Sequence, residues 1–358
     1  MTVATKLTME ALLRHIVERG ATDLHLSAHL PPYMRLDDRL VPMEYPSLSP
    51  EEVKELASSL LSPEKVERFE RWKELDFAFS IEGLARFRAN YFIQQNYVGV
   101  AIRMLPFHIL SFAELGLPAP LLTSLCQKPK GLILITGATG SGKTTTLAAM
   151  VDYLNANHDH HIVTIEDPIE YAHTSKRSIV DQREVGTDTQ SFAQGLKHVL
   201  RQDPDVILIG EMRDLETIET ALIVAETGHL VLATLHTSDA MQTVNRIVDV
   251  FPASQQNQVR VQLSMELLAV VSQQLIPRHN APGRVLATEF LLMNHAVRSL
   301  IREQKIHQVY SVMQTGQKEG MRTMNQSLYD LYINRAISLE DALGRSNDPD
   351  DLMRLMHR

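Results

Sequence analysis

The beginning of the chain alternates between short helical and short extended patterns, most with a single apolar face. Apolar residues recur at helical spacing after Thr8, which predicts an amphipathic helix that Thr8 caps and that ends near Gly20. Two further helices are expected to begin at Pro50 and Pro63, because proline is favoured in the first turn. Alternation of period two predicts strands at 23–27, 33–36, 76–81, 84–91 and 98–105. Residues 1–105 are therefore predicted to form an α+β domain.

From residue 121 the pattern changes to buried strands that alternate with helices. Uninterrupted apolar runs predict strands covered on both faces, at 132–135, 161–165, 205–209 and 229–234. This alternation is typical of a doubly wound α/β fold whose ligand lies at the carboxyl ends of parallel strands. The stretch 106–120, with three prolines, is interpreted as a linker. The second domain is predicted to cover 121–358, with mostly helical C-terminal elements from about 285 and an extended piece at 285–291.

A glycine-rich turn follows the first of these strands, and its spacing fits the pattern G-x-x-x-x-G-K-[ST] in full. Its members are Gly137, Thr139, Gly140, Ser141, Gly142, Lys143 and Thr144. Small residues let successive backbone N–H groups surround a polyphosphate, and the helix that follows, with Thr145 in it, turns its positive end toward the same charge. Lys143 is expected to reach the β- and γ-phosphates, and the Thr144 hydroxyl to bind Mg²⁺. The pattern therefore predicts a nucleotide site that includes Thr145.

Composition narrows the class of protein less than the turn does. Hydrophobic residues are 44% and charged residues 22% of 358, which is typical of a globular protein, and no apolar run is long enough to span a membrane. The first residues lack the apolar core of a signal peptide, so a cytoplasmic location is expected. The net charge of -8 argues against broad binding to nucleic acid. Cys126 is the only cysteine, which excludes a disulfide framework and a multi-cysteine zinc site within one chain.

Acidic residues follow two of the predicted strands. Glu166 and Glu211 each come directly after an apolar run, where the nucleotide is expected to lie. Hydrolysis of ATP requires a cation and an oriented water, and either carboxylate could polarise that water, while Glu211 could also hold Mg²⁺ through water. Spacing does not decide between them, although Glu166 is preferred as the base. Turn chemistry before Pro168 and capping of the next helix are the structural alternatives.

Two histidines, His229 and His236, bracket the strand at 229–234. A histidine near a sheet is often only a hydrogen-bonded structural residue. His229, next to Gly228, is instead expected to sense the γ-phosphate, and His236 to contribute to nucleotide binding, because an imidazole can bind an anion in its charged form.

Three arginines, Arg86, Arg88 and Arg103, lie on predicted strands of the first domain. Period two places Arg86 and Arg88 on one face and Phe87, with the other apolar residues of that strand, on the opposite face. The arginines are either a solvated strand face or arginine fingers directed at a nucleotide bound by a neighbouring subunit.

Four segments together resemble the secretion-ATPase superfamily. They are the glycine-rich turn, TIEDPIEY at 164–171, DVILIGEMRD at 205–214 and TGHLVLATLHT at 227–237, which are similar to the Walker A motif, Asp box, atypical Walker B motif and His box of that family. Gly210 stands where an aspartate is common in the Walker B motif. The resemblance extends to TDLHLSAHLPP at 22–32, to RFR at 86–88 and to AVRSLIRE at 296–303, which is similar to an element of the type IV pilus retraction ATPases.

The resemblance implies a RecA-like P-loop ATPase core behind an N-terminal PAS-like domain, with ATP and Mg²⁺ as cofactors. It implies a homo-hexamer, peripheral to the cytoplasmic face of the inner membrane, that acts on a pilus platform protein and drives retraction. A paralogous retraction ATPase is a further partner that it suggests. It also favours the arginine fingers: Arg88 and Arg103 in catalysis, and Arg86 in nucleotide binding.

The segment 296–303 is amphipathic by its spacing. Ala296, Leu300 and Ile301 fall on one side of a helix, and Arg298 and Arg302 on another. A solvated basic face is the simpler interpretation. The resemblance implies that Ala296, Arg298, Leu300 and Arg302 link ATP turnover to pilus retraction.

Three other functions are compatible with a phosphate-binding turn. An accessory retraction ATPase would share all the nucleotide motifs. The assembly ATPases of the superfamily differ, because they carry an extra N-terminal region and a zinc insertion with four cysteines, whereas this chain has Cys126 alone. A nucleic-acid motor is disfavoured by the acidic balance and by the absence of a basic, aromatic-rich segment. A nucleotide-gated regulator with negligible turnover is the third.

Overall fold

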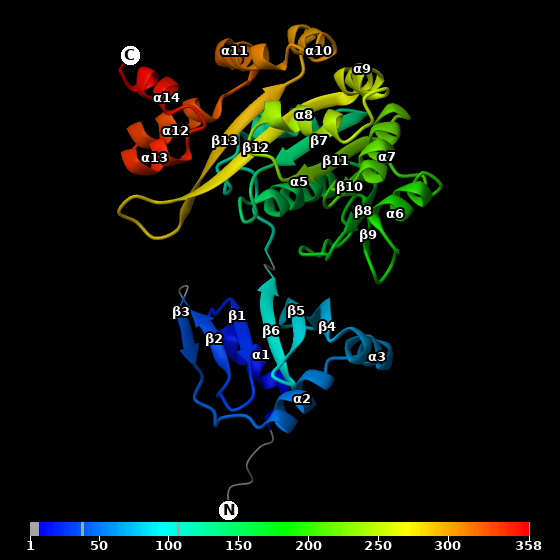
Figure 1. The fold of residues 1–358 in the computed structure, drawn as a ribbon, viewed down its shortest axis with the longest axis vertical. Helices are drawn as coiled ribbons and strands as arrows, with labels where there is room; N and C mark the ends of the chain where they lie inside the picture. Colours follow the sequence, from blue (N-terminus) through cyan, green and yellow to red (C-terminus); the bar gives the residue numbers. More distant parts are fainter. Residues whose placement is uncertain (1–6, 37–38, 106–107, 358) are drawn as a thin grey trace, which may run out of the picture. The chain divides into compact units, whose positions relative to one another are not determined.

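The computed structural model describes residues 7–36, 39–105 and 108–357, and there the chain forms two compact units (Figure 1). The first unit runs to His108 and also includes Pro168–Ala172, while the second consists of Ile109–Asp167 and the chain from His173 onward. Pro106, at the start of the predicted linker, lies outside the described residues. None of the described helices is long and apolar enough to cross a membrane.

The first unit is an antiparallel sheet with one face covered by helices α1 and α2. Its strands lie in the order β3-β2-β1-β6-β5-β4. On β5, Phe87 and Tyr91 are fully buried while Arg86 and Arg88 are half-buried on the other face, as the period-two pattern predicted. The elements are α1 (Met9–Glu18), β1 (Asp23–Leu26), β2 (Tyr33–Leu36), β3 (Arg39–Pro42), α2 (Pro50–Ser58), α3 (Pro63–Trp72), β4 (Glu74–Ile81), β5 (Ala85–Gln94) and β6 (Tyr97–Leu105).

The second unit is built on a largely parallel sheet in the order β13-β12-β7-β11-β10-β8-β9. The strands from β12 to β9 are parallel, and β13 pairs antiparallel with β12 at one edge. The strands are β7 (Gly131–Thr136), β8 (His161–Glu166), β9 (Ile179–Glu184), β10 (Val206–Ile209), β11 (Leu230–Leu235), β12 (Leu267–Pro277) and β13 (Arg284–Leu292). The doubly wound α/β core predicted from the alternation of strands and helices is confirmed.

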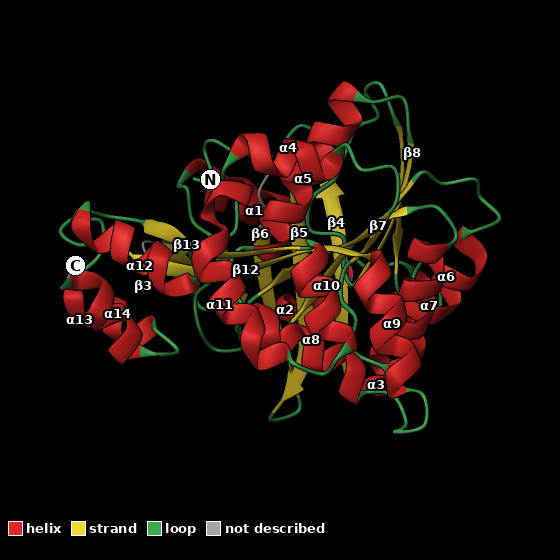
Figure 2. Cartoon of the chain, turned by 90° about the horizontal axis from the view of Figure 1, so that it is seen from above, coloured by secondary structure: helices red, strands yellow, loops and turns green. Residues whose placement is uncertain are grey.

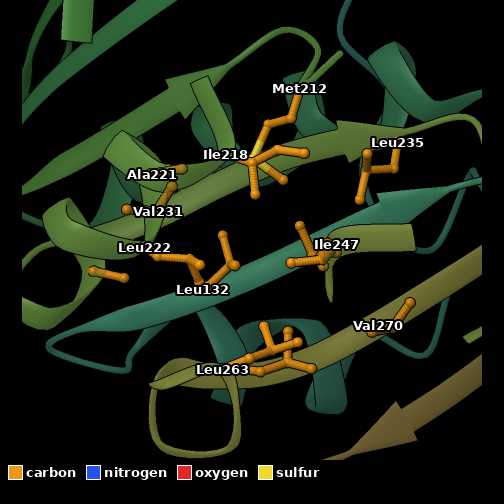
Figure 3. Packing of buried hydrophobic residues seen from close by; sticks show 14 of the residues in the cluster. Leu132, Met212, Ile218, Ala221, Leu222, Val231, Leu235, Ile247, Leu263 and Val270 are labelled. Carbon is orange, nitrogen blue, oxygen red and sulfur yellow. The ribbon is translucent and has the colours of Figure 1, made fainter. Parts of the chain in front are cut away.

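Helices cover both faces of this sheet, which is why its central strands are apolar throughout. On β7, Leu132 and Leu134 face a core that includes α6 to α11, whereas Ile133 and Ile135 face α4 and α5. Figure 2 shows α4 and α5 on one side of the sheet and α8 to α11 on the other. Figure 3 shows Leu132 and Leu222 packed together in the first of these cores. The helices are α4 (Ala119–Cys126), α5 (Lys143–Asn157), α6 (Phe192–Val199), α7 (Leu215–Glu226), α8 (Ala240–Asp249), α9 (Gln256–Glu266), α10 (His295–Arg302) and α11 (Val309–Thr315).

The C-terminal helices pack beside the β12–β13 hairpin (Figure 1). They are α12 (Met324–Ile333), α13 (Leu339–Arg345) and α14 (Pro349–Met356), and short 3-10 turns at Ile306–Gln308 and Gly316–Glu319 flank α11. Glu289, buried on β13, accepts the N–H of Ala240 (2.8 Å) at the start of α8 and the N–H of Met324 (3.2 Å) at the start of α12. Burial raises the pKa of Glu289 to about 7, although these two helix ends favour its ionised form. One side chain therefore fastens both helices to the sheet.

Three strands and the extent of the linker differ from the sequence-based expectation. β3, β9 and β12 were not predicted. The apolar residues of β12 follow directly on α9, so in the sequence they look like a continuation of that helix. Residues 109–120 were interpreted as part of a linker, but Phe112 and Leu117 are buried in the second unit against the α4 and α5 side of the sheet. The linker was therefore drawn too long, because apolar residues between prolines pack rather than bridge.

Candidate nucleotide site

The glycine-rich turn joins β7 to α5 at the carboxyl edge of the second sheet. Gly137, Gly140 and Gly142 have positive φ values of 141°, 77° and 92°, a region that favours glycine. A Cβ at Gly137 would lie 2.4 Å from the carbonyl oxygen of Gln273, so no larger residue fits there. Gly142 is the N-cap of α5 and offers no side-chain acceptor to its first N–H groups. The turn therefore leaves a helix N-terminus available for an anion.

Lys143 and Ser141 line the inside of the turn. Lys143 is buried, and its Nζ donates to the carbonyl oxygens of Gly137 (2.8 Å) and Ala138 (3.1 Å). Ser141 Oγ is buried and has no hydrogen-bond partner within the described part of the chain. Phosphate oxygens would give the Ser141 hydroxyl an acceptor, since a buried hydroxyl is costly without a partner, and they would suit the charge of the Lys143 ammonium. The residues of the turn thus fit a nucleotide polyphosphate.

Glu166, the last residue of β8, is buried between two hydrogen-bond donors. Thr164 Oγ1 donates to Glu166 Oε1 at 2.6 Å, and Gln182 Nε2 donates to the same oxygen at 3.0 Å. The side-chain oxygen of Gln182 accepts the backbone N–H of His173 at 2.7 Å. Donors of this kind stabilise the ionised carboxylate, which is the form that a general base requires.

Glu211 follows β10 and is bound on two sides. Arg213 contacts both of its carboxylate oxygens, at 2.6 and 2.7 Å, and His236 Nε2 lies 3.2 Å from Oε1. Burial by itself raises the pKa of Glu211, but the hydrogen bonds from Arg213 and the charge of His236 outweigh it and hold the pKa below its usual value. Glu211 is therefore a carboxylate at neutral pH, as a ligand of a cation must be.

Gly210, which departs from the usual second nucleotide motif, lies close to the neighbouring strand. Its N–H donates to the carbonyl of Ile165 at 2.8 Å, which draws β10 and β8 together. A Cβ at Gly210 would lie 3.3 Å from the Cα of Glu166 and 3.3 Å from the Ile165 oxygen. A larger residue at this position would therefore require the backbone next to Glu166 to shift.

The two histidines lie at opposite edges of the sheet. His236 follows β11 and meets Glu211 at the carboxyl edge. His229 precedes β11, and its carbonyl accepts the N–H of Gly131, the first residue of β7. The glycine-rich turn begins after the other end of β7, roughly 20 Å away at about 3.3 Å per residue. The prediction that His229 senses the γ-phosphate is therefore wrong for the site that this turn forms, because residues that precede a parallel strand lie at its amino edge.

The three arginines share the open face of the first unit. Arg88 lies directly opposite Arg103, which in turn lies opposite Asp23 on β1. Arg103 Nε binds Asp23 Oδ1 at 2.8 Å, and although burial raises the pKa of Asp23, its hydrogen bonds and the charge of Arg103 bring it below the usual value. Arg86 Nε donates to the carbonyl of Ile169 at 3.1 Å. Arg88 forms no hydrogen bond or ion pair within the described residues.

Helix α10 differs from the expected pattern of faces. Val297 and Ile301 are buried in the core and Leu300 is half-buried, whereas Ala296 is exposed, so the expectation that Ala296 shares the apolar side is wrong. Arg298 does not form a solvated basic face. Its guanidinium donates to the carbonyl oxygens of Ser264, Met265 (2.7 Å) and Leu267 (3.5 Å) at the C-terminal end of α9.

Arg298 thus supplies donors to helix carbonyls that have no intrahelical partner. Burial lowers the pKa of Arg298 somewhat, against the charge of Glu266, which raises it. Within the part of the chain that the structure describes, the hydrogen bond of Arg302 is a long one, from Nη1 to Ser264 Oγ at 3.4 Å.

Three residues at this edge were not predicted from the sequence: Gln182, Arg213 and Gln273. Arg213 stands two places after Glu211, a spacing that could have indicated an ion pair. Gln182 and Gln273 carry no such signal, because they reach the site only through the pairing of β9 with β8 and of β12 with β7. Gln273 Nε2 donates to Thr146 Oγ1 of α5 at 2.8 Å.

A parallel sheet in which a G-x-x-x-x-G-K-T turn leads from a buried strand into a helix is the architecture of P-loop nucleoside triphosphatases. Carboxylates at the ends of β8 and β10 complete the edge that such enzymes use. Residues 3–343 match the family described as "Type II/IV secretion system protein", and the chain belongs to that family.

Several relatives resemble the chain along most of their length. It is 47% identical over 340 residues to the Pseudomonas aeruginosa protein described as "Type IV pilus retractation ATPase PilT", covering 95% of this chain and 98% of that protein. It is 44% identical over 347 residues to "Type IV pilus ATPase PilU" of the same organism, covering 97% and 90%. The crystal structure of the pilus retraction motor PilT with bound ADP matches with a TM-score of 0.92 and 51% identity, over 97% of this chain and 99% of that one.

Proposed function

We propose that this chain is the motor that hydrolyses ATP to retract type IV pili. The observation that carries the proposal is a glycine-rich turn shaped for a polyphosphate, in a chain that matches a pilus retraction ATPase over nearly the whole of both lengths. The chain is an ATPase, as its relatives are. PilU is almost as similar, but it is matched over 90% of its length where PilT is matched over 98%. The principal retraction motor is therefore the assignment, ahead of an accessory one.

The nucleotide assigned to the turn is ATP with Mg²⁺. The Thr144 hydroxyl and, through water, the Glu211 carboxylate are the groups that would hold Mg²⁺, which neutralises charge on the phosphates. Lys143 would exchange the carbonyls of the turn for the β- and γ-phosphates. Glu166 would accept the proton of the attacking water, and His236 would hold Glu211 in place from the neighbouring strand.

We also propose a homo-hexamer in which the arginines of one subunit act on the nucleotide of the next. Arg88 faces Arg103 directly across two strands, and like charges in that position cost free energy. Asp23 compensates Arg103, but nothing within the described residues compensates Arg88. A triphosphate bound by a neighbouring subunit would supply the missing negative charge, as an arginine finger requires.

The ring would act on an inner-membrane platform protein, remaining peripheral to the cytoplasmic face of that membrane, and a paralogous retraction ATPase is a further candidate partner. Nucleic acid is not expected to bind, because the chain carries a net charge of -8.

Loss of the gene is expected to abolish pilus retraction while pili remain on the cell surface. Retraction can be measured as the force and speed with which a tethered pilus shortens. The wild-type gene should restore it, and a Lys143→Ala gene should not. Retraction that continues at normal speed and force without the gene would indicate an accessory role, and turnover that depends on added DNA would revive a nucleic-acid motor.

Arg298→Ala is expected to separate ATP turnover from retraction. The change removes charge-assisted hydrogen bonds at the end of α9 and should lower the free energy of unfolding by about 1–2 kcal/mol, which leaves the protein folded. ATP turnover should persist while retraction fails, if α10 passes the motion on. Arg302→Ala, which removes the same charge and a long hydrogen bond, is the matched variant for stability. Turnover and retraction that fall together in Arg298→Ala would make α10 a structural element only.

A further inference from the structure

The segment between β8 and β9 passes from one unit to the other and back. Pro168–Ala172 belong to the first unit, whereas Asp167 before them and His173 after them belong to the second. Ile169 and Tyr171 are buried, and the carbonyl of Ile169 accepts a hydrogen bond from Arg86 Nε at 3.1 Å. The chain therefore crosses between the units at both ends of this short segment, which begins two residues after Glu166.

The later part of the same connection is fixed to α5. Asn155, fully buried near the end of that helix, donates from Nδ2 to the Thr174 carbonyl at 2.8 Å and accepts the N–H of Lys176 at 2.8 Å. Its backbone carbonyl accepts the N–H groups of Arg177 and Ser178. Residues from 174 onward thus move with the second unit, and His173 is the joint between the fixed part and Pro168–Ala172.

Gln182 connects this joint to the catalytic carboxylate. Residues 164 and 182 are partners in the parallel register of β8 and β9, so Thr164, Glu166 and Gln182 lie on one face of the sheet. A backbone N–H can only donate, so the His173 N–H fixes the oxygen of the Gln182 amide and directs its NH₂ group to Glu166. The Thr164 hydrogen bond to the same oxygen depends on β8 alone, whereas the Gln182 hydrogen bond depends on where His173 lies.

We propose that Gln182 is a positioning residue that ties the Glu166 carboxylate to Pro168–Ala172, so that motion of the first unit changes how the base is held. Displacing the segment would move the His173 N–H away from Gln182, release the amide and weaken one of the hydrogen bonds that hold Glu166. Domain motion and proton abstraction would then be coupled within one subunit. The inference rests on the proposed role of Glu166 as the base.

The test is the pH profile of kcat for ATP hydrolysis by the full-length protein. The acidic limb of that profile reports protonation of the base, and removing a donor to a carboxylate raises its pKa. Gln182→Met keeps the shape of the side chain without its polar atoms. It should lower kcat roughly tenfold with little change in KM, and move the acidic limb to higher pH by about one unit. Gln194→Met, exposed at the start of α6, is the matched control and should change neither.

A second pair of variants tests the connection to the first unit. Lysine at 182 can donate to Glu166 but cannot accept the His173 N–H, so Gln182→Lys should hold the base and disconnect the segment. Arg86→Met, which removes the hydrogen bond to the Ile169 carbonyl, should therefore move the acidic limb upward in the wild-type background and leave it in place in the Gln182→Lys background. KM changes caused by Arg86→Met are set aside, because only the position of the limb reports on Glu166.

Failure of the inference and failure of the proposed base are distinguishable. An unmoved limb in Gln182→Met, or an equal shift by Arg86→Met in both backgrounds, would overturn the coupling while Glu166→Gln stays inactive. If Glu166→Gln keeps its turnover, the base itself is wrongly assigned. Melting curves show whether Gln182→Met folds. If it does not, Gln182→Lys carries the test, because a lysine that holds Glu166 must move the acidic limb to lower pH.

Discussion

Subunits with Arg88→Ala and subunits with Lys143→Ala are each expected to be inactive alone and to regain ATP hydrolysis when mixed. Losing an arginine finger should lower kcat by about 10³–10⁵-fold, and losing the lysine of the turn should prevent productive binding of ATP. Random mixing in equal amounts pairs an intact Lys143 with an intact Arg88 at roughly one interface in four, since each is present with a probability of about one half. The expected rate of the mixture is thus up to about a quarter of the wild-type rate.

The alternative makes a different prediction for the same mixture. If Arg88 acts on the nucleotide of its own subunit, every chain carries one defect and the mixture stays at the background rate. Arg14→Ala, which removes an exposed arginine paired with Glu10 on α1, controls for the loss of positive charge and should keep full activity alone. Arg88 is a better choice than Arg103 here, because removing Arg103 would also break its 2.8 Å ion pair with Asp23.

Glu166→Gln is expected to bind ATP with nearly unchanged affinity and to hydrolyse it about 10²–10⁴-fold more slowly. Glutamine has the same size and can still accept the Thr164 hydroxyl, but it cannot take a proton from water. Phosphate release and the affinity for a fluorescent ATP analogue, measured on the same preparation, separate the two effects. Glu219→Gln, exposed on α7, controls for the loss of a carboxylate.

Comparison with Glu211→Gln decides which carboxylate is the base. Replacing a ligand of Mg²⁺ should raise the concentration of Mg²⁺ needed for half-maximal turnover. Replacing the base should instead lower kcat at every concentration of Mg²⁺. The assignment of Glu166 fails if its variant is rescued by more Mg²⁺ while Glu211→Gln is not.

The elements that the sequence predicted well are those whose signal is local. Thr8 caps α1, and alternation along β5 buries Phe87 on one face and places Arg86 and Arg88 on the other. The apolar runs of β7 and β10 become central strands covered on both sides. The glycine-rich turn is equally local, since its glycines, its lysine and the start of α5 lie within eight residues of one another. In patterns of this kind, neighbouring residues alone determine the local structure.

What the sequence did not predict depends on the order and pairing of strands. His229 and His236 look equivalent on either side of one strand, but only the direction of β11 in the sheet decides which of them meets Glu211. Gln182 reaches Glu166 because β9 pairs with β8, and β9 itself was missed because an edge strand carries polar residues on both faces. Arg298 likewise meets the end of α9 only through the packing of α10 against it.

The tight approach at Gly210 has a consequence for how such chains are recognised. With the Glu166 backbone 3.3 Å from any Cβ at 210, restoring the aspartate that nucleotide-binding motifs commonly carry there would press on the very residue assigned as the base. The acid is found one place later, at Glu211, where the chain has left β10. A motif definition that insists on an acidic residue at 210 would therefore miss this chain because of how closely two of its strands lie, although an acidic residue stands at the next position.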